Sequence, residues 1–303
     1  MPRYKLCCLT KNKSNPAYVG AQIGAARLAK QLGSDVIPFV PEKPDDLEEQ
    51  LGNIRDAMAL RPDAILISPV DVTALDKELQ AVRDAGIVLV YSVTASEGVP
   101  GDCFVTSDNY ALGTGIATYL VGHLGGRGKV AILDGLAQSP TSPPRSRAFR
   151  DVIAANPGIE LVAAQSGDYQ FAGGKSQMAR FLATQPDLDG VISANDIMAL
   201  GALEAMKEAG RYVPIVGMNA MPDAVKAIIA EKLLATVSFD ALSLVGMGVQ
   251  AAIRILDGEA VSKVVELPAE IIDLANCAAW DRPYEDRPLP EWDVVMDRIR
   301  SAG

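Results

Sequence analysis

Short apolar runs rich in β-branched residues alternate with amphipathic segments along most of this chain. Two of the runs, AILIS (64–68) and IVLVYSV (87–93), are apolar throughout instead of alternating with polar residues. Continuous apolar runs are typical of strands that are covered on both faces, as in parallel sheets. Because such strands alternate here with helices, the sequence predicts an α/β fold of the doubly wound kind.

The alternation runs up to about residue 93 and starts again after CFVTSDN (103–109). The predicted strands cover 6–10, 35–40, 64–68, 87–93, 130–134, 159–165, 190–193, 212–218 and 233–239. The predicted helices cover 16–32, a segment from Pro44 to just before Pro62, 71–85, 109–124, 143–155, 171–184, 196–209 and 222–231. The pattern therefore predicts two doubly wound, Rossmann-like lobes. No long Pro/Gly/Ser linker separates them, which favours several crossings between the lobes and a cleft between them.

The end of the chain has a different character. A helix after Asp240 has a continuous apolar face and ends at Gly258, a residue that commonly terminates helices. The stretch 276–303 contains Trp280 and Trp292 among several prolines. It predicts an extended wrap that ends in a helix at about 291–301.

Composition excludes several classes of function. The chain has 303 residues, which suits about two domains, and its formal net charge of −10 disfavours a nucleic-acid partner. It contains a single histidine, His123, near a predicted helix end, so a structural role is expected for it and a multi-histidine zinc site is impossible. No apolar run reaches the ~18 residues of a membrane span. Residues 1–10 lack the charged and apolar regions of a secretory leader, so a leader, if export needs one, does not lie there.

The cysteines and the glycine-rich segments offer little chemistry. None of the four cysteines forms a CxxC motif, and we expect all of them to be small buried apolar residues. GTGIAT (113–118) lies inside a predicted helix and GGRGK (125–129) lacks the Ser or Thr of a phosphate loop, so neither predicts a nucleotide site. No nucleophile elbow, calcium loop or spaced acid/base pair occurs. We therefore expect no enzyme activity, no cofactor and no metal.

Several segments, taken in order, resemble the periplasmic sugar-binding proteins of the ribose-binding type, which are solute receptors of ABC transporters. The most specific are VTSDNYALGTGIA (105–117) and SANDIMALGALEAMKEAG (193–210). The others are KSNPAYVGAQIGAARLAKQLG (13–33), ILISPVDVTAL (65–75), VGMNAMPDAVKAI (216–228) and the weaker LLATVSFD (233–240). Together they span about residues 4–275.

The resemblance implies a type I periplasmic binding fold with a three-segment hinge near Ser107–Asp108, Phe239–Asp240 and Ile271–Asp273. The expected N-terminal lobe is 1–107 plus 240–271, and the expected C-terminal lobe is 108–239 plus 272–303. The ligand would lie between the lobes at the carboxyl ends of the strands, where open α/β sheets bind ligands. Amide, carboxylate and guanidinium groups there can meet neighbouring hydroxyls of a sugar, and aromatic rings can cover its apolar faces.

The resemblance also implies ligand contacts in the first lobe. Asn15 would bind hydroxyl groups, although Asn15-Pro16 also predicts a helix start. Tyr18 matches one of two neighbouring aromatic positions, and Ala17 stands at the other. Lys11 lies where some relatives carry a lysine, with a solvated lysine as the alternative.

In the second lobe the resemblance implies a larger set of contacts. Arg145 matches a ligand-contacting arginine, although SPTSPPRSR (139–147) leaves room for a shift to Arg147, and a surface arginine is the alternative. Tyr169 matches a stacking aromatic, with a core aromatic as the alternative. Asn195 matches a binding asparagine that also suits a helix cap. The remaining candidates are Met218, Asn219 in place of the usual aspartate, and Phe239 in place of a polar residue.

The clearest departure follows the strand 87–92, where ribose-type proteins carry an Asp-Arg pair and this chain has Val93-Thr94. Losing that pair removes a charge-assisted contact to ring hydroxyls, so a standard ribopyranose site is not expected. With Lys11 and Arg145 retained, the site could suit a polyol, a deoxy or small furanose sugar, or a sugar acid. A neutral sugar or polyol is favoured, and an anionic sugar derivative is the alternative.

The sequence thus predicts a periplasmic, monomeric solute receptor that captures a small sugar or polyol and delivers it to an ABC transporter permease, without nucleic-acid partners. The main alternative is the effector-binding domain of a LacI-type sugar-responsive repressor. Those repressors open with a basic helix-turn-helix of about 60 residues, whereas here the first predicted strand begins near residue 4. An enzyme on a doubly wound fold and a chemoreceptor's sensing partner are further alternatives.

Overall fold

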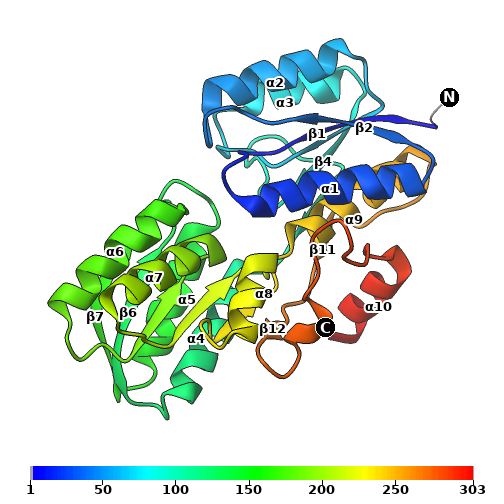
Figure 1. Ribbon diagram of the computed structural model, residues 1–303. Helices are drawn as coiled ribbons and strands as arrows, with labels where there is room; N and C mark the ends of the chain where they lie inside the picture. Colours follow the sequence, from blue (N-terminus) through cyan, green and yellow to red (C-terminus); the bar gives the residue numbers. More distant parts are fainter. Residues whose placement is uncertain (1–2, 303) are drawn as a thin grey trace. The chain divides into compact units, whose positions relative to one another are not determined.

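The computed structural model describes residues 3–302, and its strands and helices follow the predicted alternation (Figure 1). The strands are β1 (Lys5–Leu9), β2 (Asp35–Phe39), β3 (Ala64–Ile67), β4 (Val88–Ser92), β5 (Cys103–Thr106), β6 (Gly128–Asp134), β7 (Ile159–Ser166), β8 (Gly190–Ser193), β9 (Ile215–Met218), β10 (Ala235–Val237), β11 (Val264–Glu266) and β12 (Ile271–Ile272). The helices are α1 (Pro16–Gln31), α2 (Leu47–Ala59), α3 (Asp76–Asp84), α4 (Asn109–His123), α5 (Ser142–Ala154), α6 (Phe171–Thr184), α7 (Asp196–Ala209), α8 (Pro222–Ile229), α9 (Ala241–Leu256), the 3₁₀ turn η1 (Cys277–Ala279) and α10 (Trp292–Ala302).

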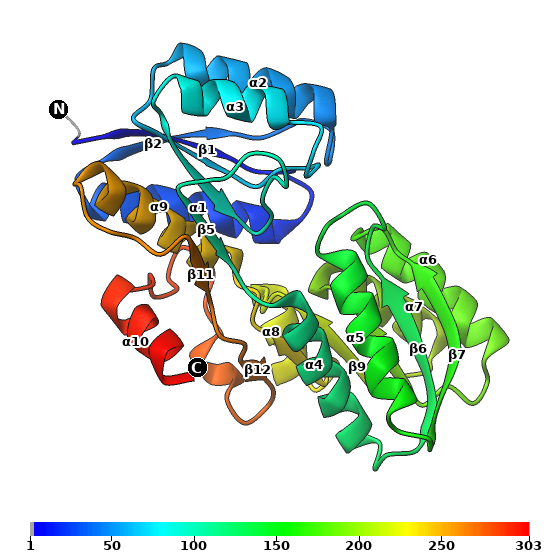
Figure 2. The ribbon, with the colours of Figure 1, turned by 180° about the vertical axis from the view of Figure 1, so that it is seen from behind.

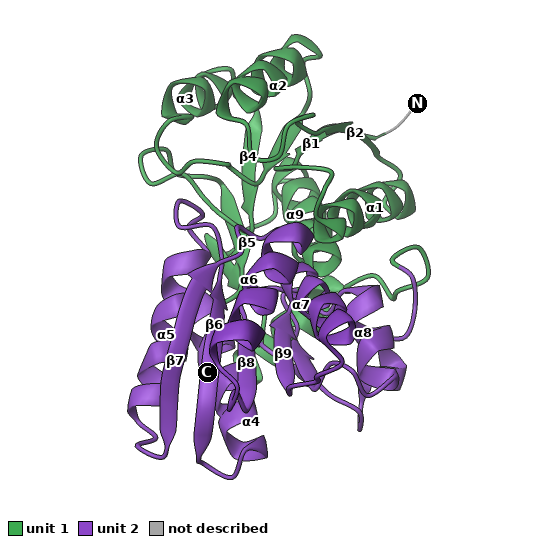
Figure 3. Ribbon diagram, turned by 60° about the vertical axis from the view of Figure 1, so that its left-hand side comes forward, with its two compact units in different colours: residues 1–107, 240–268, 284–303 green, residues 108–239, 269–283 purple. Residues whose placement is uncertain are grey.

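The chain divides into two compact units, coloured separately in Figure 3. Unit 1 comprises Met1–Ser107, Asp240–Pro268 and Tyr284–Gly303, and unit 2 comprises Asp108–Phe239 and Ala269–Pro283. The first two crossings from one unit to the other lie at Ser107/Asp108 and at Phe239/Asp240. The third falls at Pro268/Ala269 instead of near Ile271, and the chain crosses once more at Pro283/Tyr284.

Unit 1 is a parallel six-stranded sheet in the order β11-β5-β4-β3-β1-β2. Helices α2 and α3 cover one face of this sheet, and α1 and α9 cover the other (Figure 1). The central strands β3 and β4 are buried almost throughout, which explains why their sequences are continuously apolar. Figure 2 shows the edge strand β11 beside β5, a pairing that the sequence did not predict.

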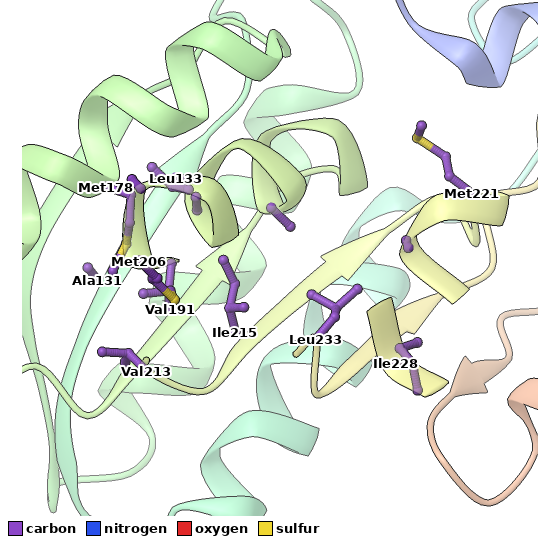
Figure 4. Close-up of a cluster of buried hydrophobic side chains, with 14 of the residues drawn as sticks. Ala131, Leu133, Met178, Val191, Met206, Val213, Ile215, Met221, Ile228 and Leu233 are labelled. Atoms are coloured by element: carbon purple, nitrogen blue, oxygen red, sulfur yellow. The ribbon is translucent and has the colours of Figure 1, made fainter. Parts of the chain in front are cut away.

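Unit 2 is a six-stranded sheet in the order β12-β10-β9-β8-β6-β7, parallel except for the short antiparallel pairing of β10 with β12. Helices α6, α7 and α8 lie on one face and α4 and α5 on the other (Figure 2). Figure 4 shows part of its hydrophobic core, in which Met178 and Met206 pack with Val191 and Ile215 of the sheet. The α/β fold class predicted from the sequence is confirmed in both units.

The assignment of residues 284–303 to the second lobe was wrong. Residues 284–291, here called the C-terminal strap, are bound to unit 1 by hydrogen bonds from two of its helices. Arg27 of α1 donates to the carbonyls of Tyr284 (2.9 Å) and Arg287 (2.8 Å). Gln250 of α9 donates to the carbonyl of Pro290 at 2.8 Å. Arg27 lies more than 200 residues before its two partners in the sequence, so no local pattern could reveal these contacts.

Two predicted helices begin later than the pattern indicated. Asp45 has a positive φ of 57°, and the Asp46 side chain accepts the Glu49 amide proton, so α2 begins at Leu47 instead of Pro44. Asp71 accepts hydrogen bonds from the backbone amides of Thr73 and Ala74, which forms a turn before α3. Side chains that bond to nearby backbone amides therefore shortened both helices at their starts.

The structure of residues 3–302 bears on the predictions about cysteines, membrane spans and metal sites. All four cysteines are buried as free thiols, as expected. No helix in this range is both long enough and apolar enough to cross a membrane. Groups of three or more His, Cys, Asp or Glu that could hold a metal ion are absent from the same range.

Candidate functional site

In unit 2, the predicted ligand-binding residues gather where the parallel strands end. Asn195 follows β8, Asn219 follows β9 and Phe239 follows β10, and these three strands are neighbours in the sheet. Since the carboxyl ends of parallel strands meet at one edge, their loops lie side by side. This carboxyl edge of unit 2 is the best-defined part of the candidate site.

Arg145 connects these loops. It lies in the first turns of α5, is 2% exposed, and its Nη1 donates to the carbonyl of Ala194, just after β8, at 2.8 Å. Its guanidinium carbon lies 4.7 Å from the centroid of the Phe239 ring, and its Nε donates to Asn109 Oδ1 at 2.8 Å. The surface-arginine alternative is therefore excluded for Arg145, whereas Arg147 is exposed, so the shifted register has no support.

The two asparagines differ in how their side chains are used. Asn195 is 2% exposed, and its Oδ1 accepts the backbone amide proton of Met198 at 3.0 Å, which caps α7. Asn219 is 7% exposed and has a positive φ of 125°, a backbone strain for a residue other than glycine. Its Nδ2 donates to the carbonyl of Phe239 at 3.4 Å, but its Oδ1 is buried without a hydrogen-bond partner. An orphaned acceptor at a strand end indicates a place for a ligand hydroxyl. Met218, the last residue of β9, is fully buried.

Tyr169 lies at the same edge, in the loop after β7. Its hydroxyl is 3.1 Å from Thr141 Oγ1, at the start of α5, and its ring lies against Gly135, directly after β6. A Cβ on Gly135 would lie 2.2 Å from the ring, so only glycine leaves room for it. Tyr169 is half-buried and has a positive φ of 58°. An aromatic ring in this position can cover an apolar face of a ligand.

In unit 1, the loop after β1 and the first turn of α1 hold three of the predicted residues. Lys11 is only 3% exposed, so the solvated-lysine alternative is excluded. Asn15 caps α1 by accepting the Ala17 amide proton at 3.0 Å, and Tyr18 lies half-buried in the first turn of that helix. Burial raises the pKa of the Asp45 carboxyl, and the Lys11 ammonium partly offsets that effect. Lys11 and Asp45 therefore form a partly desolvated pair of opposite charges at this end of the sheet.

Val93 and Thr94 occupy the loop after β4, at the same edge of the unit 1 sheet. Val93 has a φ of 71°, and the Thr94 amide donates to the Ser92 carbonyl at 2.8 Å, so these residues form a γ-turn. A β-branched residue in this region is strained by about 1–3 kcal/mol. The Thr94 hydroxyl donates to the Pro69 carbonyl at 2.9 Å, which ties the loops after β3 and β4 together. Such strain occurs often at ligand-binding loops, where the fold holds a side chain in an unusual position.

Comparisons with known proteins agree with this architecture. The family described as the periplasmic binding protein domain matches residues 7–260. This chain belongs to that family. It is 30% identical over 258 residues to the ribose import binding protein RbsB of Bacillus subtilis, covering 85% of this chain and 83% of that protein.

Two solved structures extend the comparison. An ABC transporter solute-binding protein of Actinobacillus succinogenes with bound D-allose has 26% identity and a TM-score of 0.87, over 91% of this chain and 99% of that chain. One from Mycobacterium smegmatis with bound glycerol has 27% identity and a TM-score of 0.84, over 91% and 96% of the two chains. The resemblance stated from the sequence and the predicted type I periplasmic binding fold are thereby confirmed.

Sequence reasoning missed several polar residues that hold this site together. Asn109 and Thr141 hold Arg145 and Tyr169 in unit 2. In unit 1, Gln50, in the first turn of α2, donates to the Ser68 carbonyl at 3.0 Å and accepts the Val70 amide proton at 2.8 Å. Asn109 could have been found, because it completes the SDN segment that carries the family resemblance. Gln50 could not, because its neighbours in sequence suggest only an exposed helix face.

Proposed function

We propose that this chain is the solute-binding component of an ABC importer, that it binds one small sugar or polyol, and that the carboxyl edge of unit 2 supplies ligand contacts. The observation that carries the proposal is the set at the edge of unit 2. There a buried guanidinium from the start of α5 meets a buried amide with an unpaired oxygen and two aromatic rings, which come from loops that are distant in sequence. Such a mixture of planar polar groups and aromatic rings matches the hydroxyls and C–H faces of a carbohydrate.

The comparisons support the same function. The curated relative in Bacillus subtilis is a ribose import binding protein, and the two solved structures are transporter solute-binding proteins with bound D-allose and glycerol. These relatives favour transport over the repressor alternative raised by the sequence. We further propose that the protein is a monomer in the periplasm and delivers its ligand, chemically unchanged, to a membrane permease. In this proposal it neither catalyses a reaction nor binds nucleic acid.

The first test is a thermal-shift panel of pentoses, hexoses, alditols and aldonic acids. A ligand that binds only the folded protein raises its stability by about 2.7 kcal/mol at one hundred times its Kd, so a true ligand should shift the melting temperature clearly. We expect at least one member of the panel to stabilise the protein. If every compound leaves the melting temperature unchanged, the sugar-receptor proposal is wrong.

The second test asks whether the described residues bind the compound found in the panel. Replacing Arg145 by alanine should weaken binding by roughly 1–3 kcal/mol, because a buried charged donor loses its ligand partner. Arg147→Ala is the matched control, since Arg147 lies two residues away in α5 and is exposed. Circular dichroism of both variants checks that they are folded. Equal affinities of Arg145→Ala and the wild type would mean that the site lies elsewhere.

A further inference from the structure

The charge of Arg145 is not balanced by any carboxylate in unit 2. Its partners are the Asn109 amide, the Ala194 carbonyl and the Phe239 ring, all of them neutral. Within residues 3–302, no carboxylate oxygen lies within ion-pairing distance of it, whereas Arg150, on the same helix, pairs with Asp134 at 2.8 Å. Arg145 is 2% exposed, so water does not compensate its charge either. A buried charge without a counter-charge is costly, and an anion that approached it would relieve that cost.

Two buried or half-buried carboxylates on neighbouring elements of unit 2, Asp134 and Asp196, are engaged elsewhere. Asp134, at the end of β6, forms its ion pair with Arg150. Asp196, at the start of α7, accepts the Thr236 hydroxyl at 2.7 Å with one oxygen and the Met221 amide proton at 2.8 Å with the other. Moving either carboxylate to Arg145 would leave its present donors unpaired. These two carboxylates of unit 2 therefore offer no ready counter-charge.

The hydrogen-bonding groups that remain at this edge define a ligand more closely. A guanidinium carries five N–H groups, and the contacts above use its Nε and one position on Nη1. Its planar fork matches two oxygens of a carboxylate. Asn219 Oδ1 is buried without a partner and can accept a hydroxyl proton. The complementary ligand has a carboxylate and at least one hydroxyl group.

We infer that the ligand of this receptor is a small polyhydroxy carboxylate of the aldonic-acid class, with its carboxylate on Arg145 and a hydroxyl on Asn219. This inference rests on the proposed function and narrows its ligand class from sugars and polyols in general to those that carry an acid group. The formal net charge of −10 does not oppose it, because charges on the exposed surface are screened beyond about 8 Å at physiological ionic strength. The local charge at Arg145 acts over hydrogen-bonding distance.

Calorimetric titration of matched pairs tests the inference. Each pair has the same carbon chain and stereochemistry and differs only in the terminal group, such as erythronate with erythritol, xylonate with xylitol, and gluconate with sorbitol. The acid of the best-bound pair should bind about 10- to 100-fold more tightly than its alditol, as expected for a charge-assisted hydrogen bond to a buried cation. An alditol that binds as tightly as its acid, or more tightly, overturns the inference but leaves the proposed receptor function intact. If neither member of any pair binds, and neutral sugars also fail, the proposed function itself is refuted.

Variants show whether Arg145 causes the preference. Arg145→Met should reduce the acid-to-alditol affinity ratio to about 1, and Arg147→Met should leave the ratio unchanged. Because Arg145→Met could unfold, Asn219→Asp provides a second measurement. A carboxylate at position 219 should repel the ligand acid and lower the ratio by about tenfold or more, while binding of the alditol is retained. A ratio that survives in Asn219→Asp and in folded Arg145→Met refutes the assignment.

Discussion

Arg287 of the C-terminal strap forms a buried ion pair with Asp240, the residue that caps α9. The two side chains are 4% and 8% exposed, and Arg287 Nη1 lies 3.6 Å from Asp240 Oδ1. At an effective dielectric constant of about 20, two charges at this distance attract each other by about 4–5 kcal/mol. Part of that attraction only offsets the desolvation of the two groups, but removing one partner of a buried pair costs about 3–5 kcal/mol. Arg287→Met should therefore destabilise unit 1 by about that amount at pH 7.

The stability that unit 1 loses in Arg287→Met should depend on pH in a defined direction. Burial raises the pKa of Asp240 above its ordinary value, and the Arg287 charge partly offsets this. Without Arg287 the pKa of Asp240 rises further, and the folded protein then favours the protonated form. When a carboxyl group has a higher pKa in the folded protein than in the unfolded chain, the folded protein is most stable below the unfolded pKa of about 3.9. That stability is lost as the pH rises through the folded pKa. The cost of Arg287→Met should accordingly shrink by up to about 1.4 kcal/mol per pH unit below that folded pKa.

Urea unfolding between pH 4 and pH 8 measures this effect. The chain has two tryptophans, Trp280 in unit 2 and Trp292 in unit 1, so a Trp280→Phe background restricts the fluorescence signal to unit 1. Arg298→Met, an exposed position on α10, serves as the matched control. Asp240→Asn completes a double-mutant cycle, and the double variant should lose less than the sum of the two single variants. A pH-independent loss, or strictly additive losses, would refute the argument from the buried pair.

Two further predictions concern packing and thiol chemistry. Gly20→Ala should destabilise unit 1, because a Cβ there would lie 2.7 Å from the Tyr284 ring. Gly52→Ala should instead stabilise the protein by about 0.5–1 kcal/mol, because no atom lies within 4 Å of the added Cβ. Equal melting temperatures of the two variants would contradict this prediction. Burial raises the pKa of Cys8 to about 12 and that of Cys103 to about 11. Neither thiol should therefore react with an aromatic disulfide reagent at pH 8 until urea unfolds the protein. Rapid labelling of the native protein would contradict this prediction, because it would show that the thiols are accessible.

The strands and helices were largely predictable because their signals are local. The continuous apolar run of β4 needs only its own residues to indicate a strand covered on both faces, and the structure confirms it. Asn195 and Asp240 were placed correctly at helix starts for a similar reason, since an Asn or Asp before an apolar helical pattern is a common cap. By contrast, β11 and β12 have three and two residues, too few to show a period. Their pairing depends on partner strands more than 30 residues away.

The C-terminal strap shows the limit of this local reasoning. The family match ends at residue 260 and the segments that carry the resemblance end at about residue 275, so neither covers residues 284–291. The helix at the end of the chain was predicted, but the extended path expected before it contains turns at residues 284–286. The unit to which the strap binds is decided by Arg27 and Gln250, in helices that the local pattern describes only as amphipathic. A polar side chain on the buried face of a helix is a signal that could have been used. It indicates that some other segment must supply a hydrogen-bond partner.

The same distinction explains why the sequence favoured a neutral ligand, whereas we infer an acidic one. Counting charges along the chain treats Arg145 and Arg150 alike, since both lie on α5 and Asp134 precedes them. Five residues on a helix correspond to a rotation of about 140°, so the two side chains leave α5 on different faces. Arg150 thereby reaches Asp134, and Arg145 points to the ends of β8 and β10, where only neutral groups receive it. Arg145 therefore keeps a charge that a ligand can use, because the fold places no carboxylate beside it. This difference between Arg145 and Arg150 depends on tertiary structure and not on composition.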